Sequence, residues 1–274
     1  MTHQQQRYDR IAHGYGKWWA PVLRPSAEAL LDVVENELAG PDRVVVDIGT
    51  GTGTLAIATV RRFRGTTVIA ADASEGMLAA ARREVGTRLA PGEAARIDLR
   101  QAFADSLPVA DASADAVISS FVLQLVPSRY RALVEGHRAL RPGGRLAYVT
   151  WLAGGREWAP DVVLDEALDE AGFGPREAED RPGDVPSANA AAAQLRRAGF
   201  GHVVAEAREL RHTFTPEAYL GFVEEFDEQD TFDSMSRRTR ERARRRILDG
   251  LRGLSEEERT LRLPIVYATG TRAG

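Results

Sequence analysis

The chain alternates short apolar runs with amphipathic stretches along most of its length. The run at residues 43–48 holds three consecutive valines and is of the apolar type expected when helices cover both faces of a parallel sheet. The same patterns predict strands at 43–48, 67–72, 96–103, 115–120, 145–151, 202–214 and 261–271, and helices at 26–39, 53–64, 74–85, 128–140 and 188–198. Strands that alternate with helices through short links predict a doubly wound α/β sheet.

Two stretches depart from this alternation. Residues 153–187 are rich in Gly, Pro and acidic residues around a helix predicted at 161–171, and residues 215–259 are helical and highly charged. If the last two strands are neighbours, the second stretch is an insertion between them, and such insertions tend to carry specificity. We therefore divide the chain into an N-terminal lid (1–25), a cofactor-binding core (26–151), an insertion (152–187), a core helix and strand (188–214), a helical substrate cap (215–260) and the final strand (261–274).

Composition excludes several kinds of chemistry. The 274 residues include no Cys, so thiol nucleophiles, disulfides, Cys-ligated zinc and iron–sulfur clusters are ruled out, and we expect no metal site. Lys17 is the single lysine, and no Gly-Lys-Ser/Thr sequence exists for a P-loop. No apolar run nears the length of a membrane span and the net charge is −4, so we expect a soluble cytoplasmic protein without a membrane partner.

The clearest chemical motif is the glycine-rich sequence V-D-I-G-T-G-T-G at residues 46–53, between a predicted strand and a predicted helix. Glycine permits positive φ and close approach of a ligand, and the helix start adds unpaired amide donors. Asp72, 23 residues after Gly49, ends the next predicted strand, where a carboxylate can accept both hydroxyls of an adenosine ribose. A tight turn with a turn-forming Asp is the alternative, but it does not require three glycines beside an acid at a strand end.

The spacing of the glycines distinguishes between nucleoside cofactors. A dinucleotide-binding G-x-G-x-x-G motif that began at Gly49 would end at Thr54. One that began at Gly51 would end at Ala56, which is tolerated there, but it would start two residues late relative to the strand. The chain instead reads D-x-G-x-G-x-G, which resembles the first motif of the class I S-adenosylmethionine-dependent methyltransferases.

Other segments resemble further motifs of this family. They are Asp72-Ala73-Ser74 followed by Met77-Leu78, Leu107-Pro108 followed by Asp115–Ser120, and the turn at Leu140–Leu146. The N-terminal sequence Tyr8-Asp9-x-x-Ala12-x-x-Tyr15 is similar to the lid of the small-molecule branch of the family, which includes quinone-biosynthesis enzymes. The resemblance covers residues 7–151. It implies a Rossmann-like, mostly parallel sheet of seven strands with a helical lid and insertion, S-adenosyl-L-methionine as cofactor and S-adenosyl-L-homocysteine as product.

The resemblance also implies which residues hold the cofactor. They are Asp47, Gly49, Thr50, Gly51, Gly53, Asp72, Ala73, Met77, Phe103, Ala104, Ser119 and Tyr15. One position departs from the family pattern, because Phe103 stands where an acid usually meets the adenine amino group. Either the backbone at Phe103 and Ala104 holds the adenine, or Asp105 does so through a shifted loop.

The resemblance identifies no catalytic residue. Methyl transfer from a sulfonium is an in-line displacement that depends mainly on positioning, and a general base is needed only when the acceptor must lose a proton. His13, Tyr15 and His212 are candidates for a catalytic role, with surface or packing roles as the alternative. Candidates for contact with the acceptor are Phe121, Gln124 and Trp151, and Trp18, Trp19 and Trp158 could wall the same cavity unless they belong to the core.

The sequence favours a small organic acceptor. Residues 237–246 contain seven arginines, but acidic residues just upstream provide counter-charges, so we interpret this run as a solvated helix face and expect no nucleic-acid partner. A nicotinamide-dependent oxidoreductase is disfavoured by the glycine spacing and by the lack of a Tyr-x-x-x-Lys pair. A non-catalytic partner that binds the cofactor is a further alternative, because this chemistry needs no diagnostic residue. The sequence specifies neither the attacking atom (O, N or C) nor the oligomeric state.

Overall fold

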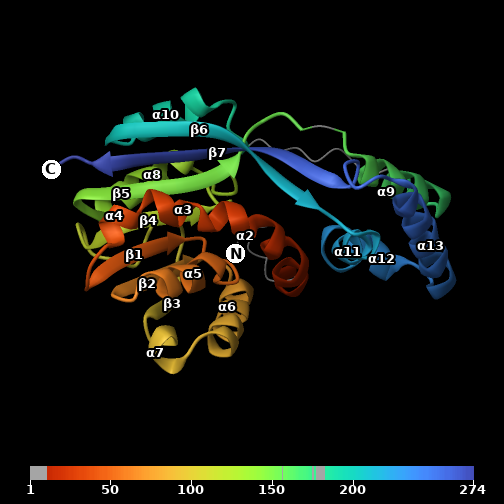
Figure 1. Cartoon of the computed structure of the whole chain (residues 1–274), viewed down its shortest axis with the longest axis horizontal. Coiled ribbons are helices and arrows are strands. Elements are labelled where there is room, and N and C mark those ends of the chain that lie inside the picture. Colours follow the sequence, from red (N-terminus) through yellow and green to blue (C-terminus); the bar gives the residue numbers. More distant parts are fainter. Residues whose placement is uncertain (1–10, 156, 175, 177–182) are drawn as a thin grey trace.

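The computed structural model describes residues 11–155, 157–174, 176 and 183–274, and within them one sheet carries the fold. Its strands are β1 (Arg43–Ile48), β2 (Thr66–Asp72), β3 (Ile97–Gln101), β4 (Ala114–Ser120), β5 (Leu140–Trp151), β6 (Phe200–Thr213) and β7 (Thr260–Arg272). They lie in the order β3-β2-β1-β4-β5-β7-β6, as Figure 1 shows. Strands β1 to β5 are parallel to their neighbours and β7 is antiparallel to both β5 and β6. The predicted Rossmann-like sheet of seven mostly parallel strands is thereby confirmed.

Helices cover both faces of this sheet, and several more lie beyond its edge. They are α2 (Ala20–Glu28), α3 (Leu30–Val33), α4 (Glu35–Leu38), α5 (Thr54–Arg62), α6 (Glu75–Arg88), α7 (Pro91–Ala94), α8 (Arg129–Ala139), α9 (Ala159–Glu170), α10 (Ala188–Arg197), α11 (Pro216–Phe222), α12 (Gln229–Ser234) and α13 (Arg237–Gly253). Successive side chains on a strand point to opposite faces. Val45 and Ile118 therefore pack with α2, α3 and α4, whereas Val46 and Val117 pack with α8 and α10.

Two predicted helices have different boundaries in the structure. The helix predicted at 26–39 begins at Ala20, with a proline in its first turn, where the missing N–H costs nothing. It is interrupted at Ala29 and again at Val34, whose φ of −105° and ψ of 11° are not helical. The helical stretch predicted at 215–259 is divided into α11, a π-helical turn at Val223–Asp227, α12 and α13.

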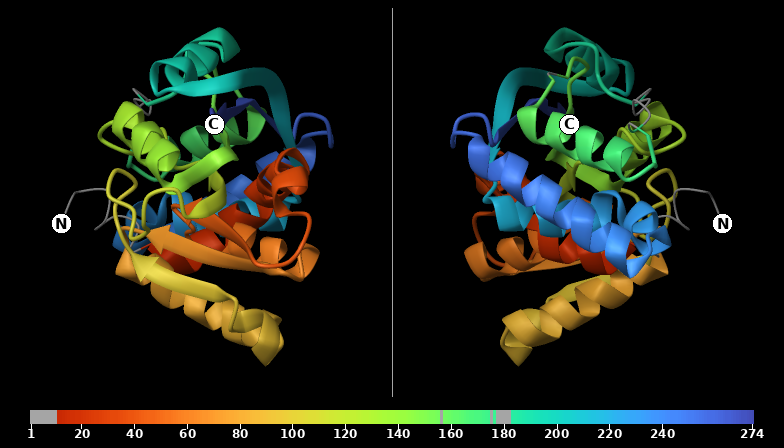
Figure 2. Two further views of the ribbon diagram at one scale, coloured as in Figure 1. Left: turned by 90° about the vertical axis from the view of Figure 1, so that its left-hand side faces the viewer. Right: turned by 90° about the vertical axis from the view of Figure 1, so that its right-hand side faces the viewer.

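Strands β6 and β7 continue beyond the edge of the rest of the sheet and carry a helical lobe. The β5–β7 ladder ends at the pair Trp151 and Ile265, whereas the β6–β7 ladder runs on to Thr213 and Thr260. Helices α11, α12 and α13 follow β6, and α9 packs against α13 (Figures 1 and 2). Within the described ranges, every helix is too short or too polar to span a bilayer.

Candidate functional site

A cavity of about 310 Å³ lies at the carboxyl ends of β1, β2 and β4. The strand order reverses between β1 and β4, and α/β folds bind ligands at such a reversal. Four parts of the chain line the cavity: the loop after β1, the end of β2 with the start of α6, residues 102–107, and residues 120–128 after β4. The N-terminal helices cover it with Tyr15 and one face of α2.

The loop after β1 has the conformation that its glycines permit. Gly49, Gly51 and Gly53 have φ of 70°, 55° and 81°, a region that side chains disfavour. A Cβ atom on Gly49 would lie 2.3 Å from a methyl group of Val122, so this glycine allows the loop to pack against the segment after β4. A Cβ atom on Gly51 would meet only Tyr15 Cε1, at 3.9 Å. Gly51 therefore leaves room in the cavity that a ligand can occupy.

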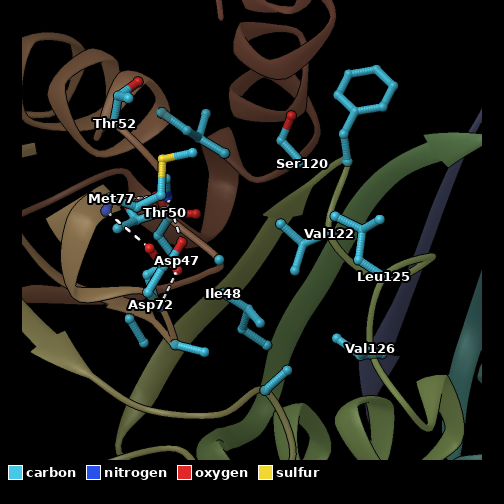
Figure 3. Close-up of a pocket in the computed structure, with 18 of the residues that line it drawn as sticks. Asp47, Ile48, Thr50, Thr52, Asp72, Met77, Ser120, Val122, Leu125 and Val126 are labelled. Carbon is cyan, nitrogen blue, oxygen red and sulfur yellow. Dashed lines mark hydrogen bonds between the residues drawn. The ribbon is translucent and has the colours of Figure 1, made fainter. Parts of the chain in front are cut away.

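Asp72 links the end of β2 to this loop. The N–H of Gly51 donates a hydrogen bond to Asp72 Oδ2 at 2.8 Å, and the N–H of Ser74 donates to Oδ1 at 2.9 Å (Figure 3). An ionised carboxylate has about four acceptor positions, so one carboxylate can serve several donors at once. The structure thus places a carboxylate directly beside the glycine-rich loop.

Asp47 is a second acid at the cavity, and its side chain is buried. The Thr50 hydroxyl donates to Asp47 Oδ2 at 2.7 Å. Burial raises the pKa of Asp47 to about 7, opposed by the Thr50 hydrogen bond and reinforced by repulsion from Asp72. A ligand with a positive charge near these two acids would favour the ionised form of Asp47.

Apolar and backbone groups form the next part of the cavity. Met77 lies in the first turn of α6, which Ser74 caps by accepting a hydrogen bond from the Met77 N–H, as its sequence position predicts. Phe103 is 49% exposed, and Phe103, Ala104 and Asp105 all line the cavity. Both ways of holding an adenine that the sequence leaves open therefore stay available.

The segment after β4 forms the opposite wall. Phe121 has a φ of 54° and its ring lies 4.3 Å from the ring of Trp151, measured between centroids. The ring centroid of Trp19 lies 6.3 Å from that of Trp151 and 5.3 Å from that of Phe222 in α11. Figure 3 shows Val122 and Leu125 on this side of the cavity, across from Asp47 and Asp72. The site therefore has an acidic, polar end and an aromatic and aliphatic end.

Most of the residues expected to bind the cofactor or acceptor lie around the cavity. Those that line it are Tyr15, Asp47, Gly49, Thr50, Gly51, Asp72, Ala73, Met77, Phe103, Ala104 and Phe121. Those outside its lining are Gly53, Ser119, Gln124 and Trp151. Ser119 Oγ donates to the carbonyl of Ile48 at 2.9 Å and holds β4 against β1. Gln124 donates to the carbonyl of Phe121 at 2.7 Å and accepts from Thr150 at 2.6 Å, so it stabilises the segment after β4.

The two histidine candidates lie away from the cavity. His13 is exposed, and the ring of His212 packs edge-on against Phe214 at 4.5 Å, where burial lowers the pKa of His212. Among the residues that line the cavity, Tyr15 is the one member of the predicted catalytic set. Arg24, Val122 and Leu125 also line it, and sequence reasoning missed them because no motif marks them.

The arginine-rich helix α13 has structural partners. Arg240 and Arg244 both form ion pairs with the buried Glu224, and Arg246 pairs with Glu166 and Glu170 of α9. Much of the positive charge on α13 therefore joins it to the neighbouring helices. Within the described residues, no group of three or more His, Cys, Asp or Glu side chains is arranged to hold a metal ion.

Comparisons with known proteins agree with this geometry. Residues 46–148 match the model of a methyltransferase domain. The ubiquinone/menaquinone biosynthesis C-methyltransferase UbiE of Syntrophotalea carbinolica is 41% identical over 117 residues, which are 43% of this chain and 47% of that protein. The chain thus spans about half the length of the curated relatives that it matches.

Solved structures show the same fold over more of the chain. The YcgJ protein of Bacillus subtilis has a TM-score of 0.54 and 19% identity, covering 91% of this chain and 99% of that one. Phosphoethanolamine N-methyltransferase 2 of Haemonchus contortus, in complex with S-adenosyl-L-methionine, has a TM-score of 0.51 and 16% identity, covering 88% of this chain and 52% of that one. The resemblance drawn from the motifs is confirmed: residues 46–148 match the model of a methyltransferase domain and are similar to quinone-biosynthesis methyltransferases.

Proposed function

We propose that this chain is an S-adenosylmethionine-dependent methyltransferase that transfers a methyl group to a small organic acceptor. The observation that carries the proposal is the two-ended cavity, in which the Gly51 loop and two acids lie opposite Phe121, Val122 and Leu125. A polar, partly cationic nucleoside suits the first end. An apolar acceptor suits the second end, close to where the reactive methyl group would be.

The residues at the polar end fit the proposed cofactor. The space beyond Gly51 admits a ligand at the loop, and Asp72 can accept hydrogen bonds from ribose hydroxyls. Met77 and Phe103 offer apolar surface for the adenine, and Asp47 offers a negative charge for the cationic end. When bound there, S-adenosylmethionine supplies a methyl group on a positively charged sulfur, which is electrophilic without further activation.

The contribution of the protein to the reaction is mainly positional. Holding two reactants in line can supply about 7–11 kcal/mol toward the barrier, and apolar walls such as Phe121 and Leu125 exclude competing water. Tyr15 can donate or accept a hydrogen bond at the cavity, so it is our candidate for orienting either reactant. The names of the similar proteins include a C-methyltransferase and an N-methyltransferase, so our proposal leaves the attacking atom open.

We also propose that residues 1–25 act as a lid and residues 215–260 as a substrate cap. Lys17 forms an ion pair with Glu225 at 2.7 Å, and Trp18 Nε1 donates to the same carboxylate at 2.8 Å. Gly221 lies so close to Trp18 that a Cβ atom there would be 2.2 Å from its ring. These contacts support a joint cover over the apolar end of the cavity.

Calorimetry tests the proposal. S-adenosylmethionine and S-adenosylhomocysteine should bind at one site per chain, whereas NAD should show no saturable heat. Incubation of the protein and S-adenosylmethionine with a panel of small phenols, amines and carboxylic acids should then release S-adenosylhomocysteine with at least one acceptor. NAD binding without a response to the sulfonium would favour the oxidoreductase. Cofactor binding without turnover on any acceptor would favour the non-catalytic partner.

A further inference from the structure

Arg24 differs from the rest of the cavity lining in its charge. It is the one basic residue among the described residues that line the cavity, where the ionisable neighbours are the three acids Asp47, Asp72 and Asp105 and the phenol of Tyr15. Its Nε atom is buried and has no hydrogen-bond partner, and Arg24 forms no hydrogen bond or ion pair with any described residue. Buried polar groups in folded proteins nearly always have partners, so a buried and unpaired Nε at a cavity needs an explanation.

The position of Arg24 in α2 directs it to the cavity. Ala20 and Ala27 line the same cavity and are four residues before and three residues after Arg24, so the three residues share one face of the helix. The alanine side chains on either side are small. Both alanines are buried, so the Arg24 side chain lies beside apolar surface, where its charge is less screened than in water.

The N-terminal helices carry Arg24 across the cavity, from the loop after β1 toward β4. Tyr15 lies over Gly51, and a Cβ atom on Gly16 would touch Thr52, so the segment starts above the loop after β1. Further along, α2 contacts β4, and the hydroxyl of Tyr267 on β7 donates to the carbonyl of Ser26 at 2.9 Å. Arg24 lies two residues before Ser26 and about two and a half helical turns after Tyr15. Helix α2 also packs on α5, so Arg24 lies on a helix that reaches from the end of the glycine-rich loop to the strands beside Phe121.

We propose that Arg24 binds a carboxylate group of the acceptor, so that the substrate class is an apolar organic carboxylate. This inference rests on the proposed function. The planar guanidinium can donate two parallel hydrogen bonds to a carboxylate, and the aromatic and aliphatic wall around Phe121 would cover the rest of the molecule. Pairing with the acceptor would supply the partner that Arg24 lacks within the described protein.

The alternative is that Arg24 binds the carboxylate of the cofactor and not one on the acceptor. Calorimetry separates these two possibilities. S-adenosylhomocysteine and 5′-methylthioadenosine, which lacks the amino-acid end, are titrated into the wild type, Arg24→Met and the exposed-residue control Arg64→Met. We expect affinities for both ligands to agree within threefold among the three proteins. Loss of S-adenosylhomocysteine binding by tenfold or more in Arg24→Met alone, with methylthioadenosine unaffected, would overturn the inference. No binding of either ligand to the wild type would instead contradict the proposed function.

The second measurement addresses the acceptor directly. Proteins saturated with S-adenosylhomocysteine are titrated with benzoate, 1-naphthoate and 3-phenylpropionate, and with the neutral amide of each. The wild type and Arg64→Met should bind at least one carboxylate ten times or more tightly than its amide. Arg24→Met should lose that preference and Arg24→Lys should keep part of it, with all variants showing the wild-type circular dichroism spectrum. Absence of any such preference in the wild type, or its persistence in Arg24→Met, would refute the role of Arg24.

Discussion

Asp47 gives the site a pH dependence that one substitution can isolate. Burial raises the pKa of Asp47 to about 7, with the Thr50 hydrogen bond opposing and Asp72 adding to the rise. Between the usual value of 3.8 and about 7, the folded protein holds a proton that the unfolded chain has lost. The contribution of Asp47 to the free energy of unfolding therefore falls as pH increases through this range and levels off above it.

The size of the effect follows from the pKa values. At about 1.4 kcal/mol per pKa unit, a rise in the pKa from 3.8 to about 7 lowers the free energy of unfolding by about 4 kcal/mol at alkaline pH. In Asp47→Asn the side-chain oxygen can still accept the Thr50 hydrogen bond, but the group cannot ionise. The variant should therefore gain stability relative to the wild type by about 3 kcal/mol between pH 5 and pH 8.

Urea unfolding at pH 5, 6, 7 and 8 measures this difference. Asp169→Asn is the control, because Asp169 is exposed and its substitution should leave the pH profile unchanged. Wild-type and Asp47→Asn curves that stay parallel within about 0.5 kcal/mol across this range would refute the reasoning from burial. An S-adenosylmethionine titration of Asp47→Asn should also show weaker binding above pH 7, because the variant has lost the negative charge that faces the ligand.

Three further substitutions test other parts of the site. Asp72→Ala should weaken S-adenosylhomocysteine binding by about 1.5–3 kcal/mol, as measured by calorimetry, because it removes a charged hydrogen-bond acceptor beside the loop. Gly51→Val should abolish that binding, because its side chain would fill the space in the cavity and strain a backbone with φ of 55°. Gly221→Ala should lower the free energy of unfolding in urea by about 1–3 kcal/mol, because the added methyl group would collide with Trp18.

Each of these variants has a matched control. Asp98→Ala, at an exposed acid, is the control for Asp72→Ala. Gly86→Val is the control for Gly51→Val, and Gly253→Ala is the control for Gly221→Ala, because no atom lies within 4 Å of a Cβ atom at Gly86 or Gly253. A folded Asp72→Ala protein with wild-type affinity would remove Asp72 from the site. Retained binding in Gly51→Val would show that the ligand avoids the loop. Equal stability of the two alanine variants at Gly221 and Gly253 would mean that the lid is not packed on the cap as described.

The fold and the polar end of the site could be predicted because local chemistry determines them. A run of apolar residues specifies a buried strand, and the glycines at 49 and 51 are needed for φ values that other residues disfavour. Ser74 stands at the start of the helix predicted at 74–85, and it caps α6. These features depend on a few neighbouring residues, which a sequence displays directly.

The apolar end of the cavity could be predicted only in part, because distant segments build it. Phe121 and Trp151 meet only when β4 and β5 pair, and Trp19 reaches them from the N-terminal helices. Ser119 and Gln124 stand where ligand contacts were expected, but each is used in a hydrogen bond between strands or within a loop. The boundaries of the first helices were also missed, because the breaks at Ala29 and Val34 follow no local stop signal.

A crystal structure of the protein with S-adenosylhomocysteine tests the central claim most directly. We predict the ribose hydroxyls within hydrogen-bond distance of the Asp72 carboxylate, the amino-acid end over the loop at residues 49–53, and the sulfur facing Phe121. Density for the ligand at another place in the protein, or an empty cavity in crystals soaked at a saturating concentration, would contradict the account.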